Sequence, residues 1–129
     1  MKNPFRSNTM INVHFRQGGG VQTFQPGDLL EADIEIIPEK VLDCKAVEVA
    51  VGWHTEGRGD RNSSTIYVEP IPITQITPEN PVNEFFSCRL PTQPWSYTGE
   101  LIQIVWTVRV KVDFNMLDIN HAETFILRP

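Results

Sequence analysis

The sequence predicts an all-β protein, an antiparallel β-sandwich of about seven or eight strands forming one domain over residues 1–129. Three observations lead to this prediction. Apolar residues recur at every second position in several short runs, prolines and glycines fall almost entirely between those runs, and no window has the apolar spacing of an amphipathic helix. Many short strands separated by turns are typical of a sandwich or a barrel. One-sided alternation favours two antiparallel sheets packed face to face.

The first predicted strands are short runs in which apolar and polar residues alternate. In chain order, the apolar positions of these runs are Ile11, Val13 and Phe15; Leu30, Ala32, Ile34 and Ile36; Val47, Val49, Val51 and Trp53; and Phe86, Cys88 and Leu90. Between two of them, residues Thr65 to Ile76 are rich in β-branched side chains but contain Pro70 and Pro72. Proline cannot donate to a strand ladder, so this run predicts an edge strand or an irregular crossing.

The strongest pattern runs from Leu101 to Phe114. All of its alternate positions are apolar: Ile102, Ile104, Trp106, Val108, Val110, Val112 and Phe114. A shift of one residue would bury Arg109, Lys111 and Asp113 instead, so the register of this strand is firmly set. A last short strand is predicted around Phe125 and Leu127.

Turn-forming segments separate the predicted strands, and they contain five of the ten prolines and seven of the eight glycines. They are Gly18–Gly20, Pro26–Asp28, Gly57–Ser64, Pro78–Pro81 and Pro91–Gly99. Residues 38–45 have room for a short turn at most, and residues 1–9 are predicted to be a poorly ordered tail. No internal repeat or linker divides the chain, which predicts a single domain.

Charge and hydropathy narrow the classes of partner. The net charge is −5, and the eleven basic residues are scattered, which argues against nucleic acid as a partner. No stretch is long and apolar enough for a membrane span, and the polar N-terminus does not resemble a signal peptide. These features predict a cytoplasmic protein without direct membrane insertion. Cys44 and Cys88 are expected to be free thiols, with Cys88 buried, although a single disulfide between them stays open.

Three motifs, in order along the chain, resemble those of the arrestin-like family. They are Phe24–Asp28, Val49–Asp60, and the segment from Phe86 through Pro91, Pro94, Tyr97 and Gly99 to Val110. The second is similar to the Trp-x-Thr-Glu-Gly-Lys/Arg-Gly-Asp segment of bacterial single-domain members. The resemblance implies an immunoglobulin-like, arrestin-like sandwich acting as an adaptor. Ala32 stands where a glycine is usual, and one domain is present instead of two, so the phosphate-sensing switch of the eukaryotic arrestins is not implied.

Catalytic and metal-binding constellations are weak in this sequence. No Gly-x-Ser-x-Gly elbow or phosphate-binding loop occurs, so the chain is not expected to be an enzyme or to hold a cofactor. His54, Glu56 and Asp60 offer too few ligands for zinc or calcium, so no metal site is predicted. The tripeptide Arg58-Gly59-Asp60 can bind integrins when exposed, but the resemblance explains it as a structural loop.

Trp95 and Tyr97 are the best interface candidates from sequence, because large aromatic residues in a proline-rich turn are not needed to fill a core. Arg58 and Asp60 are the other candidate partner-binding residues. The leading hypothesis is a non-enzymatic interaction module that binds an unidentified protein or self-associates through a sheet edge. The alternative is a small-ligand or carbohydrate-binding sandwich, in which Trp95 would lie flat on a concave face and stack on a sugar.

Overall fold

A computed structural model describes residues 9–17, 21–59, 61–114 and 117–129. These residues form eleven strands and no helix. Seven strands are long: β1 (Met10–Phe15), β3 (Leu29–Ile37), β5 (Ala46–Gly57), β6 (Ser63–Ile71), β8 (Val82–Arg89), β10 (Ile102–Asp113) and β11 (Asp118–Leu127). Four have two residues each: β2 (Thr23–Phe24), β4 (Leu42–Asp43), β7 (Gln75–Ile76) and β9 (Tyr97–Thr98).

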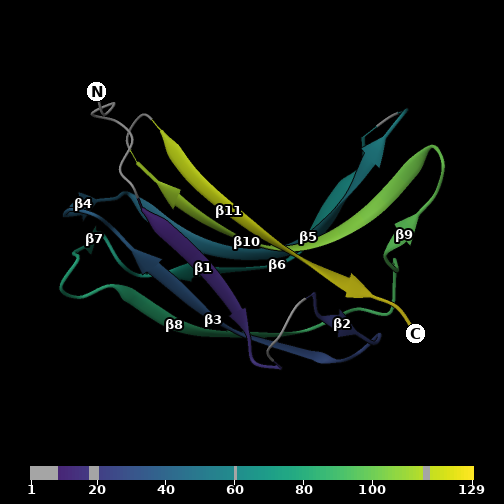
Figure 1. Ribbon diagram of the computed structural model, residues 1–129, viewed down its shortest axis with the longest axis horizontal. Helices are drawn as coiled ribbons and strands as arrows, with labels where there is room; N and C mark the ends of the chain where they lie inside the picture. The colour runs from purple at the N-terminus through teal and green to yellow at the C-terminus, as the bar shows by residue number, and fades with distance from the viewer. Residues whose placement is uncertain (1–8, 18–20, 60, 115–116) are drawn as a thin grey trace.

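The strands form a sandwich of two main sheets (Figure 1). The small sheet has the order β1-β3-β8 and is antiparallel throughout. The large sheet has the order β2-β11-β10-β5-β6, with β9 paired to β10 beyond the end of β11. It is antiparallel except where the short β2 runs parallel to β11, and β4 pairs with β7 as a separate ribbon. The antiparallel β-sandwich expected from the sequence is confirmed.

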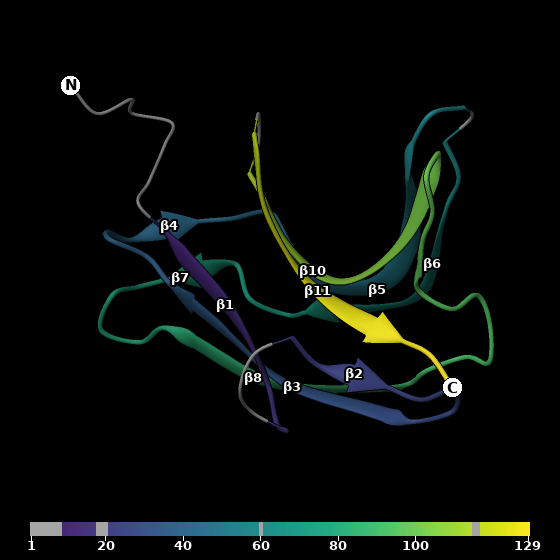
Figure 2. The same cartoon turned by 45° about the vertical axis from the view of Figure 1, so that its right-hand side comes forward.

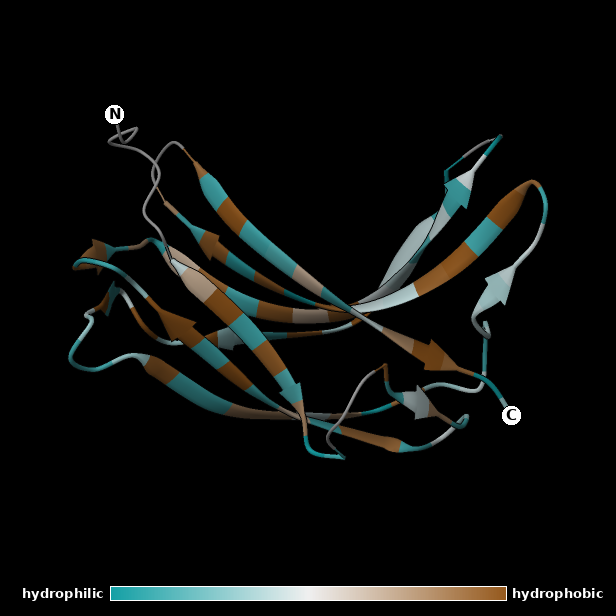
Figure 3. Cartoon of the chain, in the orientation of Figure 1, coloured by the Kyte–Doolittle hydropathy of each residue, from teal (hydrophilic) through white to brown (hydrophobic). Residues whose placement is uncertain are grey.

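The core lies between the two sheets and is built from the alternation seen in the sequence. Figure 3 shows apolar and polar residues alternating along β3, β8 and β10. All four apolar positions expected for the strand at residues 29–37 are fully buried: Leu30, Ala32, Ile34 and Ile36. On the facing sheet, the same is true of Val49, Val51, Trp106, Val108, Val110 and Val112. Burying each large apolar side chain contributes about 1.5–3 kcal/mol, which is why one register is strongly preferred.

The edge strand predicted in residues 65–76 is confirmed as β6, the outermost strand of the large sheet. Pro70 lies near its end, opposite Glu48 of β5. An edge position tolerates this proline because the ladder needs a donor on one side only.

Three expectations differ from the structure. Ile102, expected on the buried face of its strand, is 39% exposed, because this end of β10 extends past the small sheet. The last strand begins at Asp118, seven residues before Phe125. Residues 38–45, expected to contain a turn at most, include β4, which forms because tertiary packing brings Gln75–Ile76 alongside it. Residues 1–8 and 18–20 lie outside the described ranges. Within those ranges, no helix is long and apolar enough to cross a membrane.

Both cysteines are free and buried, as the sequence predicted for Cys88. Burial raises the pKa of the Cys88 thiol to about 11, and it also raises the pKa of Cys44. Because the thiolate is the reactive form, we expect neither thiol to react with Ellman's reagent at pH 8 within minutes in the folded protein. Two equivalents should react at once in 6 M guanidinium chloride. Rapid reaction of the native protein would contradict this burial.

Candidate functional site: the concave face of the large sheet

The large sheet is strongly curved, and its concave face points away from the small sheet (Figure 2). Both ends of the long strands bend upward, so the face forms a trough that crosses β6, β5, β10 and β11. One source of the bend is a register shift between Val51 and Gly52, where Ile66 of β6 is an extra residue. A Cβ atom at Gly52 would lie 2.4 Å from the Ser64 carbonyl oxygen, so this close approach of two backbones requires glycine.

The floor of the trough consists of the strand residues that alternate with the core residues. On β10 these are Thr107, Arg109 and Lys111. Arg109 lies opposite Ala50 of β5 and opposite Ala122 of β11. The trough therefore has a long charged side chain at its centre, with a single methyl group on each side.

Two adjoining hollows occupy this face, and they share Ala50, Thr65 and Arg109. The first, of about 100 Å³, is lined by these three and by Gly52, Trp53, His54, Ser63, Ser64 and Thr107. The second, of about 290 Å³, is completed by Glu48, Val68, Lys111, Asp118 and Asn120. Both are shallow and mainly polar, unlike the enclosed apolar cavities that hold most small ligands.

Charges on one side of the trough are paired. Lys111 Nζ lies 3.6 Å from Asp118 Oδ2, and Lys111 is also opposite Glu48 in the sheet register. A side-chain hydrogen bond that the protonated Asp113 carboxyl group donates to Asp118 raises the pKa of Asp113. Arg109, in contrast, is exposed, and its side chain has no hydrogen bond or ion pair to any residue that the structure describes.

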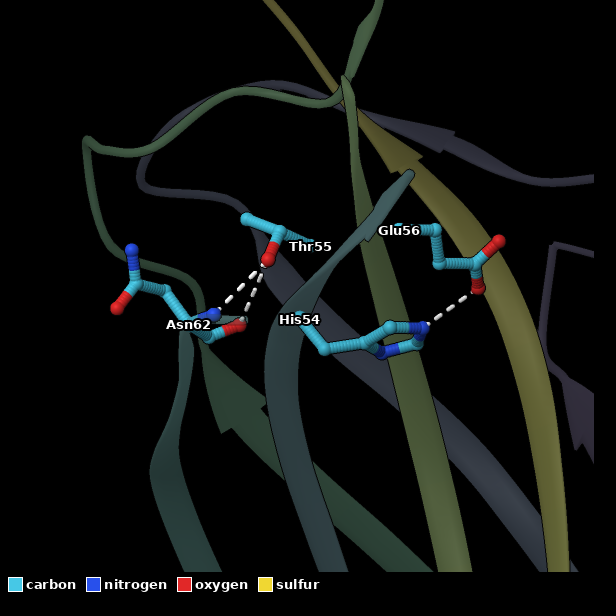
Figure 4. Close-up of polar contacts among 4 residues, drawn as sticks. All are labelled: His54, Thr55, Glu56 and Asn62. Carbon is cyan, nitrogen blue, oxygen red and sulfur yellow. Dashed lines mark hydrogen bonds and ion pairs between the residues drawn. The ribbon is translucent and has the colours of Figure 1, made fainter. Parts of the chain in front are cut away.

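The other side of the trough contains a small polar cluster (Figure 4). His54 Nε2 forms a 2.7 Å hydrogen bond with Glu56 Oε2. On the opposite side of the strand, the Thr55 hydroxyl accepts a 2.9 Å bond from the Asn62 N–H and donates a 3.3 Å bond to the Asn62 carbonyl. These bonds fix the base of the loop between β5 and β6. Asp60, a member of the weak metal set, lies outside the described residues, and no group of three potential metal ligands occurs within them.

The interface residues predicted from sequence lie elsewhere, around the end of β10 that extends past the small sheet. Trp95 is 50% exposed, and its indole N–H donates a 2.9 Å bond to the Thr92 carbonyl. Tyr97 is 56% exposed and lines a third hollow with Leu101 and Ile102. Arg58 is exposed, and its backbone N–H donates to the Leu101 carbonyl. Asp60 is not described, and neither Trp95 nor Tyr97 lines the two hollows of the trough.

Sequence reasoning placed Arg109 on the solvent face of its strand but did not single it out. Its significance depends on the alanines opposite it, and those come from strands about sixty and thirteen residues away in the chain. Arg109 is recognised as an arginine on the solvent face with small residues opposite it on both neighbouring strands. This feature can be identified only when the strand order and register are known.

Comparisons with known proteins identify the fold and no family. No family model and no curated protein matches the chain. Among solved structures, the fold is similar to Spo0M, a sporulation control protein from Bacillus subtilis, with a TM-score of 0.69 and 13% sequence identity. The similarity covers 94% of this chain and 49% of Spo0M, so the chain spans about half the length of that protein.

Proposed function

We propose that this chain is a non-enzymatic protein-binding module of the arrestin-like family, and that the trough of the large sheet is its main recognition surface. The observation that supports this most directly is the hollowed, mainly polar trough with an unpaired arginine at its centre. A broad, shallow surface of this kind suits an extended protein segment better than a small molecule, which needs a more enclosed site. The description of Spo0M as a control protein agrees with a regulatory role.

The arrangement of reactive side chains favours binding over catalysis. His54 is opposite Ser63 in the sheet, but the hydrogen bond of its ring is made to Glu56. A nucleophilic serine needs a bond from its hydroxyl to the base, and no described serine has one to a histidine. Both thiols are buried with raised pKa values, so they suit neither nucleophilic chemistry nor exchange. Free thiols also fit the reducing cytoplasm, which we propose as the compartment.

Two sheet edges offer a second route to association, including self-association. Two of the edge strands are β6, which among the described residues pairs only with β5, and β8, which pairs only with β3. Unpaired edges can accept a further strand from another chain. The bulge in β6 and the charged residues of β8 reduce this tendency, so we place edge pairing behind the trough as a binding mode.

The carbohydrate-binding alternative has less support. It requires Trp95 to present its face on a concave surface, whereas the Trp95 indole is hydrogen-bonded to its own turn and is not among the residues that line the trough. A half-exposed tryptophan in such a turn suits a protein contact at least as well.

We expect affinity capture from lysate of the source organism to retain a stoichiometric protein partner that Ala50→Trp releases. The indole would fill the floor shared by both hollows. Asn83→Trp, on an exposed position of β8, is the matched control and should retain the partner. Loss of the partner with Trp95→Ala instead would move the interface to residues 91–99. If nothing is retained and sedimentation shows a monomer, the proposal of a binding module is wrong.

A further inference from the structure

We propose that the trough recognises a carboxylate, the side chain of an aspartate or glutamate on an extended segment of the partner, and that Arg109 binds it. This inference rests on the proposed function and adds the chemistry of the ligand. It comes from three properties of Arg109: its missing partner, the space around it, and the charges that surround it.

Arg109 is unusual among the basic residues that lie within strands. There are three such residues in the part of the chain that the structure describes. Arg89 donates a 2.8 Å bond to the Gly27 carbonyl, and Lys111 is paired with Asp118. Arg109, on the central strand of the large sheet, has neither kind of partner. Its guanidinium is thus available to an external acceptor.

The neighbours of Arg109 leave room for that acceptor. Ala50 and Ala122 occupy the two opposing positions, where a longer side chain would cover the guanidinium or pair with it. Thr65 and Thr107, both opposite Gly52 and on the same face of the sheet as Arg109, line the adjoining hollow, and their hydroxyl groups can donate to the oxygens of a bound anion. Arg109, Ala50 and Thr65 line both hollows, so a ligand at this point contacts the middle of the trough.

The charge distribution favours a single carboxylate over a polyanion. One guanidinium fork matches one carboxylate through two parallel hydrogen bonds. A phosphate or nucleic acid would bring more negative charge close to Glu48 and Asp118, on a protein whose net charge is −5. No described backbone segment crosses the concave face of the large sheet (Figure 2), so an extended segment can pass over Arg109 without ending there. This geometry favours a side-chain carboxylate over a chain terminus.

The test is an NMR titration of the ¹⁵N-labelled protein with the blocked peptide Ac-Ala-Ala-Glu-Ala-Ala-NH2. We expect shifts at the Arg109 Nε–Hε signal and at the backbone amides of Ala50, Thr65 and Ala122. The glutamine version of the peptide should bind at least about tenfold more weakly. Ac-Ala-Ala-Ala-Ala-OH tests a terminal carboxylate, and the phosphoserine version tests a phosphate. Tighter binding of either one, or equal binding of the glutamine peptide, would overturn the proposal.

Arg109→Gln should abolish the shifts and Arg109→Lys should weaken them, because lysine keeps the charge but loses the planar fork. Both variants should unfold at the wild-type urea midpoint, since Arg109 has no partner in the fold. Unchanged peptide binding by Arg109→Gln would overturn the assignment of Arg109. If the captured protein partner is released by Ala50→Trp but retained by Arg109→Gln, the carboxylate inference fails while the proposed function stands.

Discussion

Replacing Trp106 with alanine is expected to lower the free energy of unfolding by about 3–5 kcal/mol, the usual range for removing a fully buried large aromatic side chain. Trp106 is the largest fully buried residue and lies at the centre of β10. The centroid of its ring lies 5.8 Å from the centroid of the Phe125 ring, and its indole N–H donates a 2.8 Å hydrogen bond to the Pro94 carbonyl. The substitution removes the packing and the hydrogen bond together. The free energy of unfolding of a domain of this size is about 5–15 kcal/mol in total, so the loss is a large part of its stability.

Equilibrium unfolding in urea, followed by circular dichroism, measures this loss. Trp106→Phe separates the two contributions, because it keeps most of the ring but leaves the Pro94 carbonyl without its donor. We expect the free energy of unfolding of the phenylalanine variant to lie between those of the wild type and the alanine variant. A cost below about 1 kcal/mol for Trp106→Ala would show that the two sheets are less tightly packed around this residue than the structure indicates.

Gly57→Ala is expected to lower the free energy of unfolding by about 2–5 kcal/mol, because it combines backbone strain with a steric clash. Gly57 ends β5 with φ of +124°, a conformation that side chains rarely adopt. A Cβ atom there would also lie 2.2 Å from the Leu101 carbonyl oxygen. That oxygen accepts the Arg58 N–H bond, so it cannot move without loosening the start of β10.

Gly59→Ala is the matched control for this prediction. Gly59 has φ of +97°, but a Cβ atom there meets no heavy atom within 4 Å. Its substitution should lower the free energy of unfolding through backbone strain alone, by about 1–2 kcal/mol. Thermal unfolding of both variants checks the difference, and equal destabilisation would mean that the contact between Gly57 and Leu101 is not tight.

Variants of the core and variants of the trough should reduce binding for different reasons. Trp106 lies on the core side of the large sheet, whereas Arg109 lies on the opposite side of the same strand. Variants of the core therefore reduce binding only through loss of folded protein, and variants of the trough reduce binding in a fully folded protein. Comparing stability with binding for both sets separates the two effects.

Much of the fold was predictable because strand formation depends on local alternation. The full burial of Leu30, Ile34 and Val108 followed from period two, since a strand with one apolar face has one favourable register. The edge position of β6 followed from Pro70. The first seven residues of β11 could not be predicted, because they contain no alternating apolar run, and they form a strand by pairing with residues 107–113 of β10.

The candidate site was less predictable than the fold. The sequence predicted Trp95 and Tyr97 as interface residues because they are large aromatic residues in a proline-rich turn, and these roles remain predictions. Asp60, predicted with Arg58, is outside the described residues. The trough was missed because it contains no motif. It arises from small residues in three strands and from the curvature of the sheet.

The sequence by itself therefore determined most of the long strands, most of their buried faces and the β-sandwich class, because each depends on residues close together in the chain. Tertiary structure alone decided the strand order, the β4–β7 pair, and the meeting of Arg109 with Ala50 and Ala122. The physical reason is that side-chain alternation fixes which face of a strand is buried, while pairing between distant strands is set by how all the buried faces fit together. The free guanidinium at the centre of the trough is a result of that fit.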